Sequence, residues 1–251
     1  MPFRLHLFGT CRITGPDGLV EGRVSRPRQL AFLALASAPS GGTTRDRIGA
    51  YLWPDTSPSD ARHLVADTLH ILRKELGDEG LRSVGECICL DPSGIWCDVP
   101  EFRAARAAEE WERMLELYEG PFLDGFHGPG GGDFERWVEG ERLRCREVAL
   151  YAVHRLAALR ESRGDLVGAA DCLRRGRAVD PFDEQITRKL MAFLARLGNR
   201  AEAVRAYRTL DRRLSRELDL RPSPETRAVR EAILAGEASG EPAGDPALRA
   251  R

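Results

Sequence analysis

The chain has 251 residues, of which 42% are hydrophobic and 31% charged, so it has enough apolar residues for a packed core and is not globally disordered. Its formal net charge is −1, which removes any argument from bulk basicity for binding nucleic acid or membranes. No apolar run approaches the roughly 18–20 residues that span a bilayer, and the N-terminal residues do not have the pattern of a signal peptide. We therefore expect a cytoplasmic protein of one or two domains.

Short runs of alternating apolar residues open the chain. Phe3, Leu5 and Leu7 are followed by Cys11 and Ile13, and glycines and a Pro-Asp-Gly turn interrupt them. Alternation with a period of two predicts short antiparallel strands within residues 3–24.

Three helices are predicted next. The first covers about Arg26 to Ser37 with Ser25 as N-cap, and the second runs from Arg45 to Trp53. The third, residues 59–77, is the longest. It has an apolar stripe at helical spacing, formed by Ala61, Val65, Leu69, Leu72 and Leu76.

A β-hairpin is predicted after the third helix. Residues 86–90 and 95–99 flank Asp91-Pro92-Ser93-Gly94, a typical turn sequence. Strands, three helices and a hairpin are the layout of a winged helix, in which the third helix enters the major groove of DNA.

The rest of the chain reads as helical, with a short helix pair, a Gly/Pro-rich loop at 120–132 and a long helix from about Asp133 to Arg163. Gly164-Asp165 recurs as Gly198-Asn199, 34 residues later, which is the tetratricopeptide period. We predict a mainly α fold with a small β part, in which residues 1–99 form a winged helix-turn-helix domain, residues 100–235 a tetratricopeptide-like domain, and residues 236–251 a disordered tail.

The third helix carries the candidate site on the face opposite its apolar stripe. Its cations suit phosphates and its histidines suit base edges. The alternative is an ordinary solvated face, and residues 1–97 hold eleven basic and eleven acidic side chains, whereas DNA-binding modules usually have a basic excess. Arginines at the starts of the first two helices add phosphate contacts. The predicted DNA-binding residues are Arg26, Arg28, Arg45, Arg62, His63, Asp67, His70, Arg73 and Lys74.

Catalytic and metal chemistry find little support. The glycine run Gly128–Gly132 lacks the Lys-Ser/Thr of a phosphate-binding loop. Cys87 and Cys89 share a strand face, and only a longer turn would bring Cys97 opposite Cys89, with no histidine to complete a zinc set. The aromatic residues around the loop are either core or a surface that docks a partner. We expect no enzyme activity, no metal and no cofactor.

The order of these segments resembles the Streptomyces antibiotic regulatory protein family, within the group that carries a bacterial transcriptional activation domain. The matching stretches begin with Arg26-Pro-Arg-Gln-Leu-Ala-Phe-Leu-Ala-Leu and Leu52-Trp53-Pro-Asp, and continue with Leu69-His70-Ile-Leu-Arg73-Lys-Glu-Leu-Gly, Tyr118-Glu-Gly-Pro-Phe-Leu and Leu218-Asp-Leu-Arg-Pro-Ser-Pro-Glu-Thr-Arg. Together they span about residues 3–235.

The resemblance implies an OmpR-type winged helix in a transcription activator that binds double-stranded DNA at direct repeats. One arrangement that it allows is a homodimer on these repeats. It also implies a contact with RNA polymerase or another protein. Ala66, Asp67 and Ile71 depart from the basic or amide character of relatives, and residues 84–89 lack the basic residues that relatives carry in the wing. Two alternatives stay open: a protein-interaction module whose winged helix no longer binds DNA, and the front end of a larger regulator.

Overall fold

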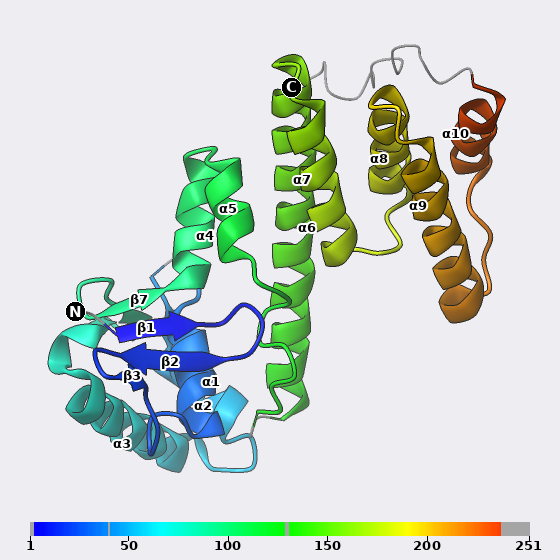
Figure 1. Ribbon diagram of the computed structural model, residues 1–251. Helices are drawn as coiled ribbons and strands as arrows, with labels where there is room; N and C mark the ends of the chain where they lie inside the picture. Colours follow the sequence, from blue (N-terminus) through cyan, green and yellow to red (C-terminus); the bar gives the residue numbers. More distant parts are fainter. Residues whose placement is uncertain (1–2, 40, 129–130, 237–251) are drawn as a thin grey trace. The chain divides into compact units, whose positions relative to one another are not determined.

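The computed structural model describes residues 3–39, 41–128 and 131–236. The predicted tail, residues 236–251, lies outside these ranges apart from Gly236. The chain forms two compact units, residues 1–148 and 149–251, and the division falls inside the long helix α6 (Gly132–Ser162). The β structure is confined to the first unit, as Figure 1 shows, so the predicted mainly α fold is confirmed.

A four-stranded sheet opens the first unit. Its order is β3 (Gly18–Leu19), β2 (Arg12–Gly15), β1 (Phe3–His6) and β7 (Ile95–Cys97). β1 pairs antiparallel with β2 and parallel with β7, and Figure 1 shows β1 between these two neighbours. Leu5, Ile13 and Cys97 are partners in register and are all buried, because alternate residues point to the same side of a sheet. The early strands predicted from alternation are confirmed.

Three helices follow: α1 (Pro27–Ala36), α2 (Arg45–Leu52) and α3 (Pro58–Leu76). The Thr44 and Ser57 hydroxyls accept hydrogen bonds from backbone N–H groups in the first turns of α2 and α3. The predicted N-cap of α1 is wrong. Arg26 occupies that position without a capping side chain, while the Ser25 hydroxyl donates instead to the Gly22 carbonyl oxygen.

The predicted hairpin of residues 86–90 with 95–99 is also wrong. β6 (Cys87–Leu90) pairs with the preceding strand, β5 (Leu81–Val84), through a tight turn at Gly85-Glu86, and β4 (Thr43–Thr44) pairs with the other edge of β6. The segment at Asp91 is a connection that delivers β7 to the other sheet. Neither predicted cysteine register therefore occurs, because Cys97 lies in a different sheet from Cys87 and Cys89.

A buried carboxylate links the chain segments that follow the neighbouring strands β1 and β7. Asp98 begins α4 (Asp98–Ala107) and accepts hydrogen bonds from the backbone N–H groups of Leu7, at 3.0 and 2.9 Å, and Phe8, at 3.0 Å. Burial raises the pKa of Asp98 to about 6, against the three N–H bonds that favour the charged form.

Asp98 should therefore make the protein less stable as the pH rises. The folded-state pKa of Asp98, about 6, exceeds the unfolded value near 3.9. The folded chain therefore binds the proton more tightly than the unfolded chain. The stability that this tighter binding contributes is lost as the pH rises from about 4 to about 6. We expect the contribution of Asp98 to the free energy of unfolding to fall by about 3 kcal/mol. Carbon-13 NMR titration of the Asp98 carboxyl carbon tests this. A midpoint at or below pH 4 contradicts it.

The rest of the first unit is helical. α4 and α5 (Trp111–Leu117) form the expected short pair, and Phe8 lies against Phe102 and Tyr118 with ring centroids 5.1 and 5.0 Å away. Phe122 and Phe134 are buried and contact Trp137 at 5.6 and 5.7 Å. Phe122 and Phe134 are therefore core, whereas Tyr118 and Trp137 are only partly buried.

The second unit contains the predicted repeat. After α6 come α7 (Leu166–Val179), α8 (Glu184–Arg196) and α9 (Arg200–Arg213). Gly164 and Gly198 both adopt a positive φ, 77° and 78°, and each immediately precedes the N-cap residue of the next helix. Ala169 and Ala203, at matching positions, are fully buried where paired helices approach closely.

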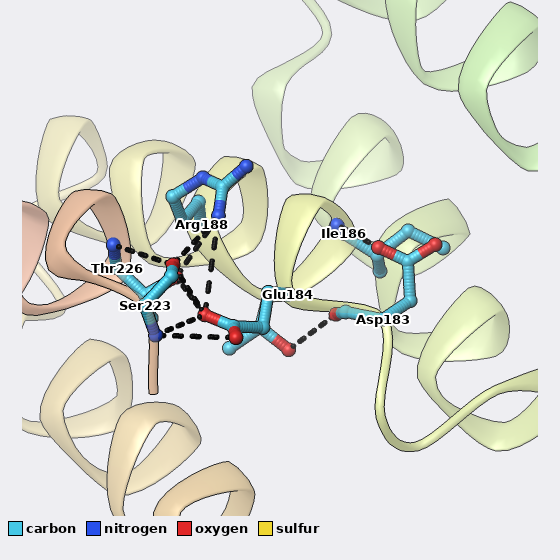
Figure 2. A network of polar contacts seen from close by, with 7 residues as sticks. Asp183, Glu184, Ile186, Arg188, Ser223 and Thr226 are labelled. Carbon is cyan, nitrogen blue, oxygen red and sulfur yellow. Dashed lines mark hydrogen bonds and ion pairs between the residues drawn. The ribbon is translucent and has the colours of Figure 1, made fainter. Parts of the chain in front are cut away.

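A polar network attaches the last helix, α10 (Pro224–Ala235), to the start of α8 (Figure 2). The carboxylate of Glu184 accepts from the Ser223 backbone N–H at 2.9 Å, from the Ser223 hydroxyl at 2.6 Å and from the Thr226 hydroxyl. Arg188 donates to the Thr226 hydroxyl at 3.0 Å. Burial acts to raise the pKa of Glu184, but these hydrogen bonds outweigh it and hold the pKa below its usual value.

Candidate nucleic-acid interface

The third helix presents two different faces. Its predicted apolar stripe is buried, with Val65 and Leu72 fully enclosed and Ala61, Leu69 and Leu76 at most 6% exposed. The opposite face is open to solvent. Its exposed side chains are Arg62, His63, Ala66, Asp67, His70 and Lys74. α3 therefore has the geometry that groove insertion requires: one side anchored in the core and the other free.

Four of these side chains have no partner. His63, Asp67, His70 and Lys74 make no hydrogen bond or ion pair within the described residues. The two imidazoles offer ring nitrogens that can hydrogen-bond, Asp67 offers acceptors, and Lys74 offers three donors. This set can read base edges and hold one phosphate without breaking an existing contact.

Arg62 is already paired. Its Nε and Nη2 donate to the two carboxylate oxygens of Asp46 on α2, at 2.7 and 3.0 Å. The bond from Arg62 holds the pKa of Asp46 below its usual value. This pair fixes the guanidinium at the start of α3 and also offsets its charge, so a phosphate must compete with Asp46 for it.

Arg45 and Arg73 meet at the wing, the hairpin formed by β5 and β6. Arg45 donates to the Ser83 hydroxyl at 3.0 Å, and Arg73 donates to the same hydroxyl at 3.2 Å and to the Leu81 carbonyl oxygen at 3.0 Å. Both arginines were expected to contact DNA directly. In the structure their hydrogen bonds hold β5 beside α2 and α3, and two positive charges remain at that junction.

The two arginines of α1 are in different surroundings. Arg26 is exposed at the start of the helix. Arg28 is partly buried, with its guanidinium carbon 5.3 Å from the ring centroid of Trp53, and its Nε is buried without a hydrogen-bond partner among the described residues. Of the two, Arg26 is therefore the more accessible cation.

The corrected strand pairing adds a residue that the sequence interpretation missed. Because β5 forms one strand of the wing, Arg82 lies on it with a side chain 66% exposed, paired to Asp91 at 3.1 Å. The sequence does indicate this hairpin, because the turn Gly85-Glu86 separates two four-residue segments, Leu81–Val84 and Cys87–Leu90. The wing therefore carries a cation, contrary to the expectation from residues 84–89.

Other kinds of site are not built in the part of the chain that the structure describes. There, no three His, Cys, Asp or Glu side chains are grouped as metal ligands would be. None of the described helices is both long and apolar enough to cross a bilayer. Within the glycine run Gly128–Gly132, residues 129 and 130 lie outside the described ranges.

Comparison with known proteins gives consistent results. The chain is 26% identical over 227 residues to the transcriptional regulatory protein MoaR1 of Mycobacterium bovis and of Mycobacterium tuberculosis, covering 83% of this chain and 72% of each relative. It is 32% identical over 232 residues to the transcriptional regulator RedD of Streptomyces coelicolor, covering 88% of this chain but 56% of RedD.

A solved structure shares the fold. Mycobacterium tuberculosis EmbR, solved in complex with a low-affinity phosphopeptide, superposes with a TM-score of 0.60 at 22% identity, over 95% of this chain and 68% of that one. Residues 99–234, more than half of the chain, match the family model of the bacterial transcriptional activator domain. The chain thus belongs to the bacterial transcriptional activator domain family, whose members are transcriptional regulators and not enzymes.

Proposed function

We propose that this protein is a DNA-binding transcription activator that inserts α3 into the major groove at promoter repeats. The observation that carries the proposal is the solvent face of α3, where His63, Asp67, His70 and Lys74 have no partner among the described residues and lie opposite a buried apolar stripe. Family membership and the regulators MoaR1 and RedD support the same function.

Each part of the chain has a role in this proposal. Residues 1–99 bind DNA, with His63 and His70 at base edges and Lys74 and Arg26 at phosphates. Residues 100–235 contact RNA polymerase or another protein. Two copies of the chain occupy direct repeats.

A second candidate is a protein-interaction module whose winged helix does not bind DNA. The Arg62–Asp46 pair and the unpartnered Asp67 favour it, because they leave the exposed face of α3 with little net positive charge. The two candidates differ in salt dependence. Binding to DNA releases counterions and weakens steeply as salt rises, whereas absence of binding at low salt rejects the DNA role.

Substitutions on α3 should separate phosphate contact from base readout. Lys74→Ala should weaken binding to all duplexes about equally and reduce the slope of log affinity against log salt by about 1. His70→Ala should instead change which sequences are preferred, with a discrimination loss of about 1–3 kcal/mol at one base pair. Selection from randomised duplexes at two salt concentrations measures both. A sequence preference that His70→Ala leaves unchanged contradicts the assigned role.

A further inference from the structure

The outer face of α9 carries a row of arginines, which we call the α9 stripe: Arg205, Arg208 and Arg212. They are spaced i, i+3 and i+7, so they share one side of the helix and stand opposite its buried residues. All three are exposed, and with Thr209 and Asp211 they line a surface depression of about 370 Å³.

The charge of the α9 stripe is not balanced by the fold. None of its guanidinium groups has an ion pair among the described residues, and the same holds for the neighbouring Arg213 and Arg216. The two acids of α9 have partners outside the stripe, although Asp211 also lines the depression. Glu202 accepts from Arg174 of α7 at 2.7 Å, and Asp211 lies 3.8 Å from Arg221.

Some arginines elsewhere in the second unit do find acids. Arg174 contacts Asp171 as well as Glu202, and Arg196 contacts Glu161 at 2.5 Å. An ordinary solvated surface mixes the two signs of charge, as α7 and α8 do here. The α9 stripe gathers three exposed arginines on one side of a single helix, and none of them has an ion pair among the described residues.

A second observation indicates the same shortage of negative charge. Arg177 of α7 is partly buried, and its Nε is enclosed without a hydrogen-bond partner among the described residues. Burial, and then the positive charge of Arg213, lower the pKa of Arg177. The positive charge of Arg213 therefore acts on a second, partly buried arginine beside α9.

Apolar residues follow the stripe along the chain. The π-helical turn η2 (Leu214–Leu218) continues α9, and Leu218 and Leu220 are 50% and 55% exposed. A DNA backbone presents phosphates and no apolar surface of this kind, whereas protein interfaces combine arginine with apolar contacts. The mixture favours a protein partner over a nucleic acid.

We propose that the α9 stripe docks an acidic, partly apolar protein surface, and that in the proposed function, on which this inference rests, the surface belongs to RNA polymerase. Guanidinium groups would pair with carboxylates of the partner while Leu218 and Leu220 cover its apolar residues. Charge pairs of this kind speed association and weaken as salt rises.

The test compares two triple variants of the full chain. Arg205→Gln, Arg208→Gln and Arg212→Gln together remove the stripe while keeping long side chains of good helix propensity. The matched control, Arg163→Gln, Arg175→Gln and Arg227→Gln, removes the same charge from exposed arginines away from the stripe. The probe is purified RNA polymerase holoenzyme from the source bacterium, with binding measured at low and moderate salt.

Removal of the stripe should weaken polymerase binding about tenfold at low salt and flatten its salt dependence, while the control binds as wild type. Duplex DNA is measured in parallel. Wild-type affinity of the stripe variant for polymerase overturns the proposal, as does a wild-type chain that does not bind polymerase. A stripe variant that loses duplex binding but keeps polymerase binding also overturns it, since the surface would then hold a nucleic acid. Failure of the DNA role itself shows separately, as absence of duplex binding by wild type.

Discussion

Ala66→Glu is expected to weaken binding to duplex DNA by at least about 30-fold, because it adds a carboxylate to the centre of the exposed face of α3, where like-charge repulsion costs about 2 kcal/mol or more. Ala66 is exposed and lies among His63, Asp67 and His70, so the larger side chain meets no core residue. The free energy of unfolding should change little. Fluorescence anisotropy with a labelled duplex and urea denaturation measure the two quantities.

The control for this variant is Ala104→Glu, which adds the same charge to an exposed position of α4. It should leave DNA affinity within about twofold of wild type, since long-range repulsion is screened at moderate salt. Asp67→Asn makes the reverse change, because it removes a negative charge from the exposed face of α3. It should therefore strengthen binding to the duplex. Equal affinities for the Ala66→Glu variant and wild type would show that α3 does not enter the duplex.

Gly42→Ala is expected to lower the free energy of unfolding of the first unit by about 3 kcal/mol or more. Gly42 has a φ of +94°, and a Cβ built on it lies 2.0 Å from the carbonyl oxygen of Ile88 in the wing. That oxygen belongs to a backbone pair, Thr43 with Ile88, so it cannot move without breaking the attachment of β4 to β6. DNA affinity should fall with it, because the wing loses its support.

The neighbouring glycine supplies a matched control. Gly41 has a similar φ, +86°, but a Cβ there meets nothing within 4 Å. Gly41→Ala should therefore cost only the backbone strain, about 1 kcal/mol. Thermal or urea denaturation of the two variants isolates the clash from the strain. Equal losses of stability in both would refute the close packing of the wing against residue 42.

Local periodicity predicted most of the fold. The apolar stripe of α3 and the Gly164–Gly198 repeat follow from spacing within a single helix or helix pair, where neighbours in sequence decide which side is buried. The structure confirms both. Exposure of His63, His70 and Lys74 could be predicted for the same reason, because the face opposite a buried stripe points to solvent.

Non-local pairing could not be predicted in this way. β7 pairs with β1 across about 90 residues of sequence, and turn residues at 91–94 resembled a hairpin that the chain does not form. The role of Asp98 depends on the same distant pairing, since its partners are the backbone groups of Leu7 and Phe8. Arg73 was predicted only as a DNA-binding residue, and its hydrogen bond to the Leu81 carbonyl oxygen could not be predicted before β5 is placed.

Whether the exposed face of α3 reads the major groove can be decided by methylation interference on duplexes selected from random sequence. Methylation of guanine N7 blocks the major groove, while methylation of adenine N3 blocks the minor groove. We expect interference at guanine N7 within each repeat, and we expect it to be lost or shifted in the His70→Ala variant. Interference confined to adenine N3, with the His70→Ala pattern identical to wild type, would contradict it.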